Sequence, residues 1–152
     1  MGTSALLAAA GHGLFRRFAV VEASMRPLIE PGDWIVGRRW AGTPRRGDIV
    51  VFEHPAVSGR SLVKRVVGLP SERIDIARGY VHINGVVLAE PWVAGTTTPE
   101  GTWWVPPGHV WVLGDNRPAS IGDSRHLGPI PTATLQWKVL ARYWPAARAA
   151  RL

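Results

Sequence analysis

The chain contains no cysteine, which excludes disulfide bonds, cysteine-ligated zinc, iron–sulfur clusters and thiol nucleophiles. It has no uninterrupted run of about 18 apolar residues, so a conventional transmembrane helix is not expected. It also lacks a phosphate-binding loop, and its five histidines show none of the paired spacings that bring two imidazoles to one metal ion. We therefore expect no metal ion, no cofactor and no nucleotide chemistry.

Lysine is scarce as well: 16 of the 18 basic residues are Arg, and only Lys64 and Lys138 are Lys. With 11 acidic residues the net charge is +7, which predicts an anionic partner surface such as nucleic acid or phospholipid headgroups. A length of 152 residues, 46% of them hydrophobic, is typical of one globular domain.

The segment 3–21 is apolar but interrupted by basic residues. On a helical wheel Leu7, Leu14 and Phe18 share one face and Arg16 lies opposite, which predicts an amphipathic helix. Such a helix can lie in a membrane interface or pack on its own domain. The expected organisation is an amphipathic or membrane-peripheral segment at 1–17, a folded domain at 18–145 and an Ala/Arg tail at 146–152.

Beyond residue 18, short β-branched and aromatic runs alternate with Gly, Pro and Asp at about ten-residue intervals, which is typical of an all-β sandwich or barrel. We expect a mostly β fold of short antiparallel strands with a short N-terminal helix and little other helix. Asn84-Gly85 predicts a two-residue hairpin turn. Residues 90–108 predict one long exposed excursion. The expected strands are 18–21, 34–36, 49–52, 62–67, 74–76, 80–88, 110–113 and 135–143.

Without thiols, the candidate nucleophiles are hydroxyl groups. Ser24 follows an apolar run and precedes Met25-Arg26-Pro27, where the proline fixes the backbone just beyond the hydroxyl. A nucleophile needs a rigid position and a backbone N–H that can face a reacting oxygen. As an alternative, the four residues Ser24 to Pro27 simply begin a turn and have no catalytic role.

A matching base is Lys64, which stands inside an apolar run. In a chain that otherwise uses Arg, a Lys at such a position suggests that a proton must be able to leave, because Arg keeps its proton in proteins and Lys does not. Burial lowers the pKa of an amine, and a neutral Lys is a general base for a serine hydroxyl. The alternative is a strand Lys whose stem packs and whose amine reaches water, and Lys138 fits that alternative better.

A third polar segment, 114–125, lies between an apolar run and a Pro-rich turn. It is either a solvated loop or part of a site. In the second case Asp123 and Arg125 are placed to form a supporting salt bridge, and Ser120 is placed to orient a lysine amine.

Together these segments resemble the type I signal peptidases, membrane-associated serine proteases with a Ser/Lys dyad. The similarity rests on four ordered motifs that lie within about residues 18 to 144: Ser24-Met25-Arg26-Pro27 with Pro31-Gly32-Asp33; Arg46-Gly47-Asp48-Ile49-Val50-Val51-Phe52; Val63-Lys64-Arg65-Val66-Val67-Gly68-Leu69-Pro70; and Gly114-Asp115-Asn116-Arg117 with Asp123-Ser124-Arg125 and Gly128-Pro129-Ile130.

The resemblance implies endoproteolysis after small residues of the Ala-x-Ala type, through an acyl-enzyme on Ser24 with Lys64 as the base. It implies that Ser120 orients the lysine and that Asp123 and Arg125 form an ion pair beneath it. The partner is then a signal or leader peptide that adds as an extended strand, with small-residue pockets lined by Met25, Ile29, Leu62 and Val63.

The chain departs from the family pattern in several places. Leu28-Ile29 follow the first motif where a Thr-Leu pair is common. Glu22 stands where some members carry a hydroxyl that acts as a second oxyanion donor, and an ionised carboxylate cannot donate. One additional residue separates Ser120 from Asp123. The usual N-terminal membrane span is replaced by the segment 3–21, so we expect peripheral attachment to the cytoplasmic membrane or a cytoplasmic location.

Of three alternatives to this interpretation, two remain open from sequence. One is a cytoplasmic maturation protease that trims a specific leader, such as that of nickel-type superoxide dismutase. Self-cleaving repressors share the dyad, but they need a DNA-binding domain for which 23 residues before Ser24 are too few. The last is a non-enzymatic basic β module whose eight Trp bind membrane or nucleic acid, with Trp103-Trp104 as a membrane-facing tip. The protease interpretation expects no nucleic acid partner and leaves the oligomeric state open.

Overall fold

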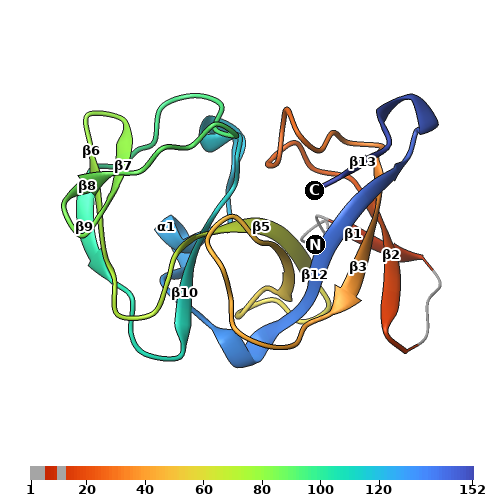
Figure 1. Cartoon of the computed structure of the whole chain (residues 1–152), viewed down its shortest axis with the longest axis horizontal. Coiled ribbons are helices and arrows are strands. Elements are labelled where there is room, and N and C mark those ends of the chain that lie inside the picture. Colours follow the sequence, from red (N-terminus) through yellow and green to blue (C-terminus); the bar gives the residue numbers. More distant parts are fainter. Residues whose placement is uncertain (1–5, 10–12) are drawn as a thin grey trace.

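The computed structural model describes residues 6–9 and 13–152, and these form mainly β-strands (Figure 1). The predicted mostly β, antiparallel fold is confirmed. The described helical elements are α1 (Ser124–Leu127) and the 3-10 turns η1 (Arg117–Ala119), η2 (Thr132–Thr134) and η3 (Ala146–Arg148). The strands are β1 (Leu6–Ala9), β2 (Phe15–Val20), β3 (Trp34–Arg39), β4 (Ile49–Glu53), β5 (Ser61–Gly68), β6 (Arg73–Ala77), β7 (Tyr80–Ile83), β8 (Val86–Val87), β9 (Gly101–Trp104), β10 (His109–Leu113), β11 (Ile130–Pro131), β12 (Leu135–Trp144) and β13 (Ala150–Arg151).

The strands form two sheets. The larger sheet has the order β1-β2-β3-β12-β4-β5-β10-β11, with β13 added to β12, and the smaller has the order β8-β7-β6-β9. In the described residues the path of the larger sheet runs from β1 to β11 without closing, so it is no closed barrel. Figure 1 shows the small sheet on one side of the molecule and β2, β3 and β12 on the other.

Strand β5 lies at the centre of this arrangement, between β4 and β10. Every residue of β5 after Ser61 is buried, so the strand is covered on both faces. Three apolar clusters meet around it. One contains Phe18, Ile35 and Val63, a second contains Phe52, Leu62 and Val66, and a third joins β5 and β10 to the small sheet. A polar group on β5 is therefore removed from water.

The predicted N-terminal helix is wrong for the part of the segment that the structure describes. Residues 6–9 and 15–20 are strands that pair antiparallel, with Leu6 opposite Val20, and residues 3–5 and 10–12 lie outside the described residues. The helical wheel placed Leu14 and Phe18 on one face, yet Leu14 is 56% exposed and Phe18 only 2%. The buried positions Phe18 and Val20 alternate with a period of two, and pairing with β3 decides in favour of a strand.

The hairpin prediction at 80–88 is confirmed, with Asn84 and Gly85 at φ of 49° and 84° in the turn between β7 and β8. The excursion predicted at 90–108 is wrong in part, because it contains β9, which pairs with β6. Trp103 packs against Trp111 with ring centroids 5.2 Å apart, whereas Trp104 is exposed. Packing of Trp103 on the third apolar cluster thus stabilises this segment as a strand of the small sheet.

In the part of the chain that the structure describes, no helix has the length and hydropathy needed to cross a bilayer.

Candidate active site

Ser24 lies in a tight turn that follows β2. The turn is held by Asn116, whose backbone N–H donates to Ser24 O at 2.9 Å and whose side-chain amide donates to Ala23 O at 3.1 Å. Ser24 is 2% exposed. Its own backbone N–H has no acceptor among the described residues. The structure therefore fixes the hydroxyl in place and leaves a free N–H donor beside it.

Lys64 lies in the middle of β5, and its side chain is fully buried. Its Nζ lies 2.8 Å from Ser24 Oγ, although the two residues are 40 positions apart in the chain. Within the described ranges this is the one side-chain hydrogen bond of the amine. The two residues that the sequence selected as nucleophile and base are thus in direct contact.

The surroundings of Lys64 lower its pKa to about 8. Burial is the main cause, because desolvation disfavours the ammonium form. The negative charges of Asp123 and Glu22 act in the opposite direction, and the positive charges of Arg60 and Arg125 add to the lowering. When charged, the ammonium donates to Ser24 Oγ, and once neutral it can accept the hydroxyl proton.

Asp123 and Arg125 form the predicted ion pair, with Arg125 Nη2 2.8 Å from Asp123 Oδ2 and Arg125 Nε 3.0 Å from Oδ1. Burial acts to raise the pKa of Asp123, but the hydrogen bond and charge of Arg125 outweigh it, so the pKa is lowered. Arg125 also donates to the backbone oxygens of Arg117 and Ser120. The pair therefore ties the two ends of the polar segment together.

Ser120 is buried and donates to Asp123 Oδ2 at 2.8 Å. Within residues 13–152 no hydrogen bond joins Ser120 to Lys64, so the structure links Ser120 to the ion pair rather than to the amine. Gly114 lies between Ser120 and the turn of Ser24. A Cβ on Gly114 would stand 2.1 Å from Ser120 Oγ and 2.8 Å from Ser24 O, so only glycine fits there.

Three further charged residues support the site, although the sequence placed them only within a motif and gave no role to their side chains. They are Arg65, Asp115 and Arg117. Arg65, next to Lys64 on β5, binds Asp115 through two bonds of 2.8 and 2.7 Å and lies over the ring of Trp92. Arg117 is buried, pairs with Glu90 and donates to the backbone of Gly114. The sequence signal was a charge inside an apolar run for Arg65, and charges directly after an apolar run for Asp115 and Arg117, because buried charges need partners. These pairs fix the segment that holds the Ser24 turn.

The four predicted pocket residues are almost fully buried, at most 1% exposed. They do not form one group: Leu62 packs in a different cluster from the other three, since successive β5 side chains point to opposite faces. Leu62 shares its face with Lys64, and a Cβ on Gly122 would touch it at 3.6 Å. The other three are Met25, Ile29 and Val63.

Lys138 matches its sequence interpretation as a strand lysine that reaches the surface. Its side chain is 33% exposed, and its amine lies 2.9 Å from Asp48 Oδ1. The two lysines of the chain thus differ in environment: one faces an acid at the surface, and the other, Lys64, faces a hydroxyl in the core.

In residues 6–9 and 13–152 no three His, Asp or Glu side chains gather in a way that could hold a metal ion. What the buried centre does hold is a serine hydroxyl bonded to a lysine amine of lowered pKa, within a mostly β fold. That combination defines the class of serine hydrolases in which lysine replaces histidine as the base.

Comparison with known proteins agrees with this class. Residues 2–144 match the model of the family described as signal peptidase, peptidase S26. A signal peptidase I of Bacillus caldolyticus is 36% identical over 150 residues, which cover 87% of this chain and 81% of that protein. A signal peptidase I of Leptolyngbya laminosa is 34% identical, over 85% of this chain and 68% of that protein. The chain belongs to the signal peptidase S26 family.

A solved structure is similar as well. The crystal structure of a signal peptidase I from Enterococcus faecalis superposes with a TM-score of 0.58 at 32% identity and covers 65% of this chain and 98% of that one. These relatives support a serine endopeptidase of the signal peptidase I type. They do not favour the leader-maturation or binding-module alternatives.

A pair of charges flanks the dyad. Glu22 Oε1 lies 3.6 Å from Arg60 Nη2, and both side chains are largely buried. Glu22 raises the pKa of Lys64 and Arg60 lowers it. Glu22 is the residue two positions before Ser24, where the resemblance leads to the expectation of a hydroxyl.

Neutralising the two members of this pair separately is expected to shift the pH dependence of the enzyme in opposite directions. Glu22→Gln removes a charge that favours the ammonium, so the pH of half-maximal activity should fall. Arg60→Gln removes a charge that disfavours it, so that pH should rise. Each shift should be below about one pH unit, because both groups are partly screened by solvent. The measurement is kcat/KM for peptide cleavage between pH 6 and about 10, a range that spans the free and charged amine.

Shifts of the pH of half-maximal activity in the same direction for both variants would contradict the idea that the charges of Glu22 and Arg60 set the pKa of Lys64. Arg73→Gln, a charge change in the small sheet where the exposed Arg73 pairs with Asp75, serves as the control and should leave the profile unchanged.

Proposed function

We propose that this protein is an endopeptidase that removes N-terminal signal peptides after small residues, with Ser24 as nucleophile and Lys64 as base. The observation that carries the proposal is the 2.8 Å contact between Lys64 Nζ and Ser24 Oγ, made by a fully buried amine whose pKa is lowered to about 8. Such an amine is neutral in a large fraction of molecules near pH 8 and can take a hydroxyl proton.

The reaction then has two halves. Ser24 Oγ attacks the scissile carbonyl carbon while its proton moves to Lys64 Nζ, and the oxyanion faces the free N–H of Ser24. Collapse of this intermediate breaks the C–N bond, Lys64 returns the proton to the leaving amine, and an ester on Ser24 remains. Water attacks the ester, gives its proton to Lys64, and the proton returns to Ser24 as the acid product leaves.

The remaining predicted residues either hold the polar segment in place or line the substrate pocket. Asp123 and Arg125, with Ser120 bonded to them, are positioning residues that hold the polar segment against the Ser24 turn. The proposed pocket walls are Met25, Ile29, Leu62 and Val63, which are at most 1% exposed and therefore offer little surface to a large substrate side chain. The proposed place of action is the surface of the cytoplasmic membrane, to which the protein attaches peripherally.

The test is cleavage of a soluble peptide that carries Ala-x-Ala before the intended cut, with products identified by mass spectrometry. We expect one cut after the second Ala, and at least a 100-fold lower kcat/KM when that Ala is replaced by Phe, because a closed pocket excludes a large side chain. Equal cleavage of both peptides would overturn the proposed specificity. No cleavage of either peptide by the wild-type protein, in the presence or absence of detergent, would overturn the proposed activity.

A further inference from the structure

Strand β1 (Leu6–Ala9) lies beside the dyad, where a peptide substrate of the proposed enzyme is expected to add as an extended strand. It pairs antiparallel with β2, and Leu6 is opposite Val20, four residues before Ser24. It also lies close to β5, the strand of Lys64. A segment of the chain itself therefore neighbours both strands from which the dyad comes.

The side chain of Leu6 covers part of the predicted substrate pocket. It is 3% exposed and belongs to the same apolar cluster as Met25, Ile29 and Val63. These three are predicted pocket walls, and each is at most 1% exposed. A pocket that receives a substrate side chain is normally concave and open before the ligand binds. Here an aliphatic side chain of the chain's own first strand packs with the walls instead.

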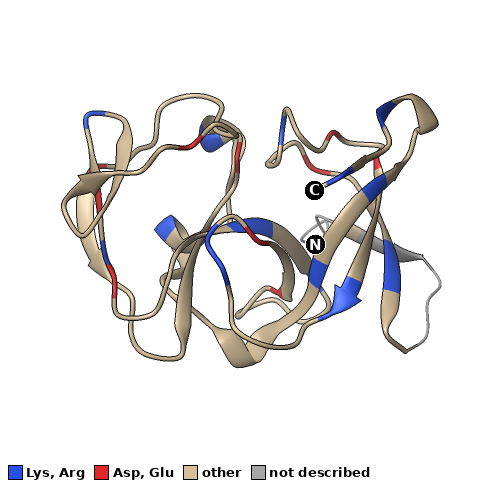
Figure 2. Ribbon diagram, in the orientation of Figure 1, with Lys and Arg blue, Asp and Glu red and all other residues tan. Residues whose placement is uncertain are grey.

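The contacts that hold β1 are of a kind that a peptide can also make. Residues 6–9 contain no charged residue, so the strand offers no ion pair to Arg16 and Arg17 of its neighbour β2 (Figure 2). It is held by backbone pairing with β2 and by the burial of Leu6. Strand addition of a peptide uses the same two contributions, backbone hydrogen bonds and pockets for alternate side chains. An extended apolar peptide can therefore replace β1.

We propose that β1 is an internal competitor of the substrate: it occupies the strand-binding edge beside the dyad and must leave before a peptide binds there. This inference deepens the proposed function, on which it rests for the identity of the competing peptide. Only the fraction of molecules with β1 displaced binds substrate, and the apparent KM is raised by the inverse of that fraction. At saturating substrate every molecule is open, so kcat is unaffected.

The size of the effect follows from Leu6. Burial of a leucine side chain favours the closed state by about 10- to 100-fold in the equilibrium constant. Leu6→Asp removes this contribution and would bury a carboxylate, so β1 should leave the edge. We expect KM for the Ala-x-Ala peptide to fall about tenfold or more, with kcat within about twofold of wild type.

Leu14→Asp is the matched control. Leu14 lies in the turn before β2 and is 56% exposed, so the variant makes the same change of side chain and charge outside the apolar cluster. Its KM and kcat should both stay within about twofold of wild type.

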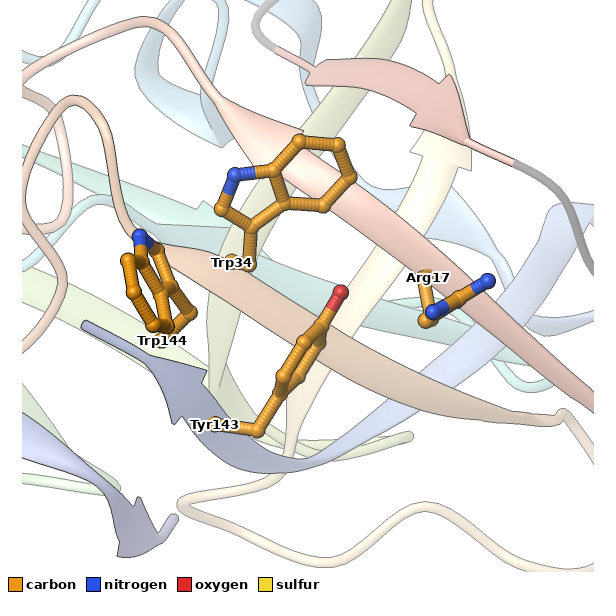
Figure 3. A pocket seen from close by; sticks show the side chains of 4 residues that line it. All are labelled: Arg17, Trp34, Tyr143 and Trp144. Atoms are coloured by element: carbon orange, nitrogen blue, oxygen red, sulfur yellow. The ribbon is translucent and has the colours of Figure 1, made fainter. Parts of the chain in front are cut away.

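The outer face of β2 offers a position for a reversible lock. Side chains alternate along a strand, so Ala19 shares its face with Arg17 and not with the buried Phe18. Figure 3 shows this outer face, where a cavity of about 330 Å³ is lined by Arg17, Trp34, Tyr143 and Trp144. A substitution at residue 19 therefore stays clear of the core side of β2.

Leu7→Cys with Ala19→Cys places two cysteines at directly paired positions of β1 and β2. Opposite Cα atoms in such a pair are about 4.5 to 5.5 Å apart, which suits a disulfide. The chain has no other cysteine, so this is the only disulfide that can form within one molecule. Oxidation pins β1 to β2, and we expect kcat/KM to fall at least about tenfold and to return on reduction with dithiothreitol.

The two single-cysteine variants are the controls for the lock, and oxidation should leave their activity unchanged. Equal cleavage by the oxidised and reduced forms of the double-cysteine variant would overturn the proposal. A KM of Leu6→Asp within about twofold of wild type would overturn it as well. The oxidised and reduced forms are compared in the same protein, so that result does not depend on the folding of Leu6→Asp.

Peptide binding separates a failure of this inference from a failure of the proposed function. A fluorescently labelled Ala-x-Ala peptide is titrated onto Ser24→Ala with and without Leu6→Asp, and its fluorescence polarisation is measured. The protein that also carries Leu6→Asp should bind about tenfold or more tightly. This difference in binding without any cleavage by wild type would overturn the proposed function alone. Cleavage by wild type without a difference in binding would overturn the role of β1 alone.

Discussion

Replacing Lys64 by Met is expected to abolish peptide cleavage and, at the same time, to make the folded protein more stable below pH 8. Met has nearly the same length as the lysine stem and fits a fully buried position on β5, but it has no proton to exchange. Without the base, Ser24 keeps its proton, so kcat should fall by about 10⁴-fold or more. Loss of activity together with a gain of stability distinguishes a functional charge from a structural one.

The gain in stability follows from the pKa of Lys64. In the unfolded chain the amine has its ordinary pKa of 10.5, and in the folded protein the pKa is about 8. Below pH 8 both states carry the charge, so the folded state bears the full penalty of up to about 3 kcal/mol. Between pH 8 and 10.5 the penalty shrinks, and above 10.5 it is gone. The advantage of Lys64→Met in urea unfolding should therefore be full at pH 7 and vanish near pH 10.5.

Lys64→Arg is the control that keeps the charge. Arg remains protonated in proteins, so this variant should be inactive at every pH and less stable than wild type, because the buried position must accept a larger permanent cation. Cleavage by Lys64→Arg at more than about a hundredth of the wild-type rate would contradict the role of Lys64 as base. A large loss of stability in Lys64→Met at pH 7 would contradict the cost assigned to the buried charge.

The second large effect is expected for Ser24→Ala, which should lower kcat by about 10⁴-fold or more with little change in stability. The variant removes the reacting oxygen and one hydrogen bond to Lys64, while Asn116 still holds the backbone of the turn. Single-turnover cleavage of the Ala-x-Ala peptide, followed by mass spectrometry, measures the loss. Ester formation on the wild-type serine should be detectable in the same experiment.

Ser58→Ala is a matched control, because it removes an exposed hydroxyl from the loop before β5. It should cleave the peptide at the wild-type rate. If Ser24→Ala retained more than about a tenth of wild-type activity while Lys64→Met were inactive, another nucleophile would have to be sought near the amine. Ser120 is then the first residue to test, since it is buried and bonded to Asp123, whose charge acts on Lys64.

Several features followed from local sequence because local physics decides them. Asn84-Gly85 tolerates positive φ, and its hairpin forms as predicted. The β-branched runs 49–52 and 62–67 have no helical period and become β4 and β5. Residues 6–9 and 15–20 contradict the predicted helix because their apolar spacing fits a helix and a strand almost equally well, and pairing of β2 with β3 selects the strand.

The sequence by itself determined which groups are able to react: it supplied one lysine in an apolar strand, one serine before a fixed turn and the acid–base pair of Asp123 and Arg125. Only the tertiary structure decided that Lys64 and Ser24, 40 positions apart, meet at 2.8 Å. It also decided that Ser120 bonds to Asp123 and that Gly114 leaves the space between Ser120 and the turn of Ser24. The reason is physical: residue type fixes what a side chain can donate or accept, whereas its pKa and partners depend on burial and on contacts between distant strands.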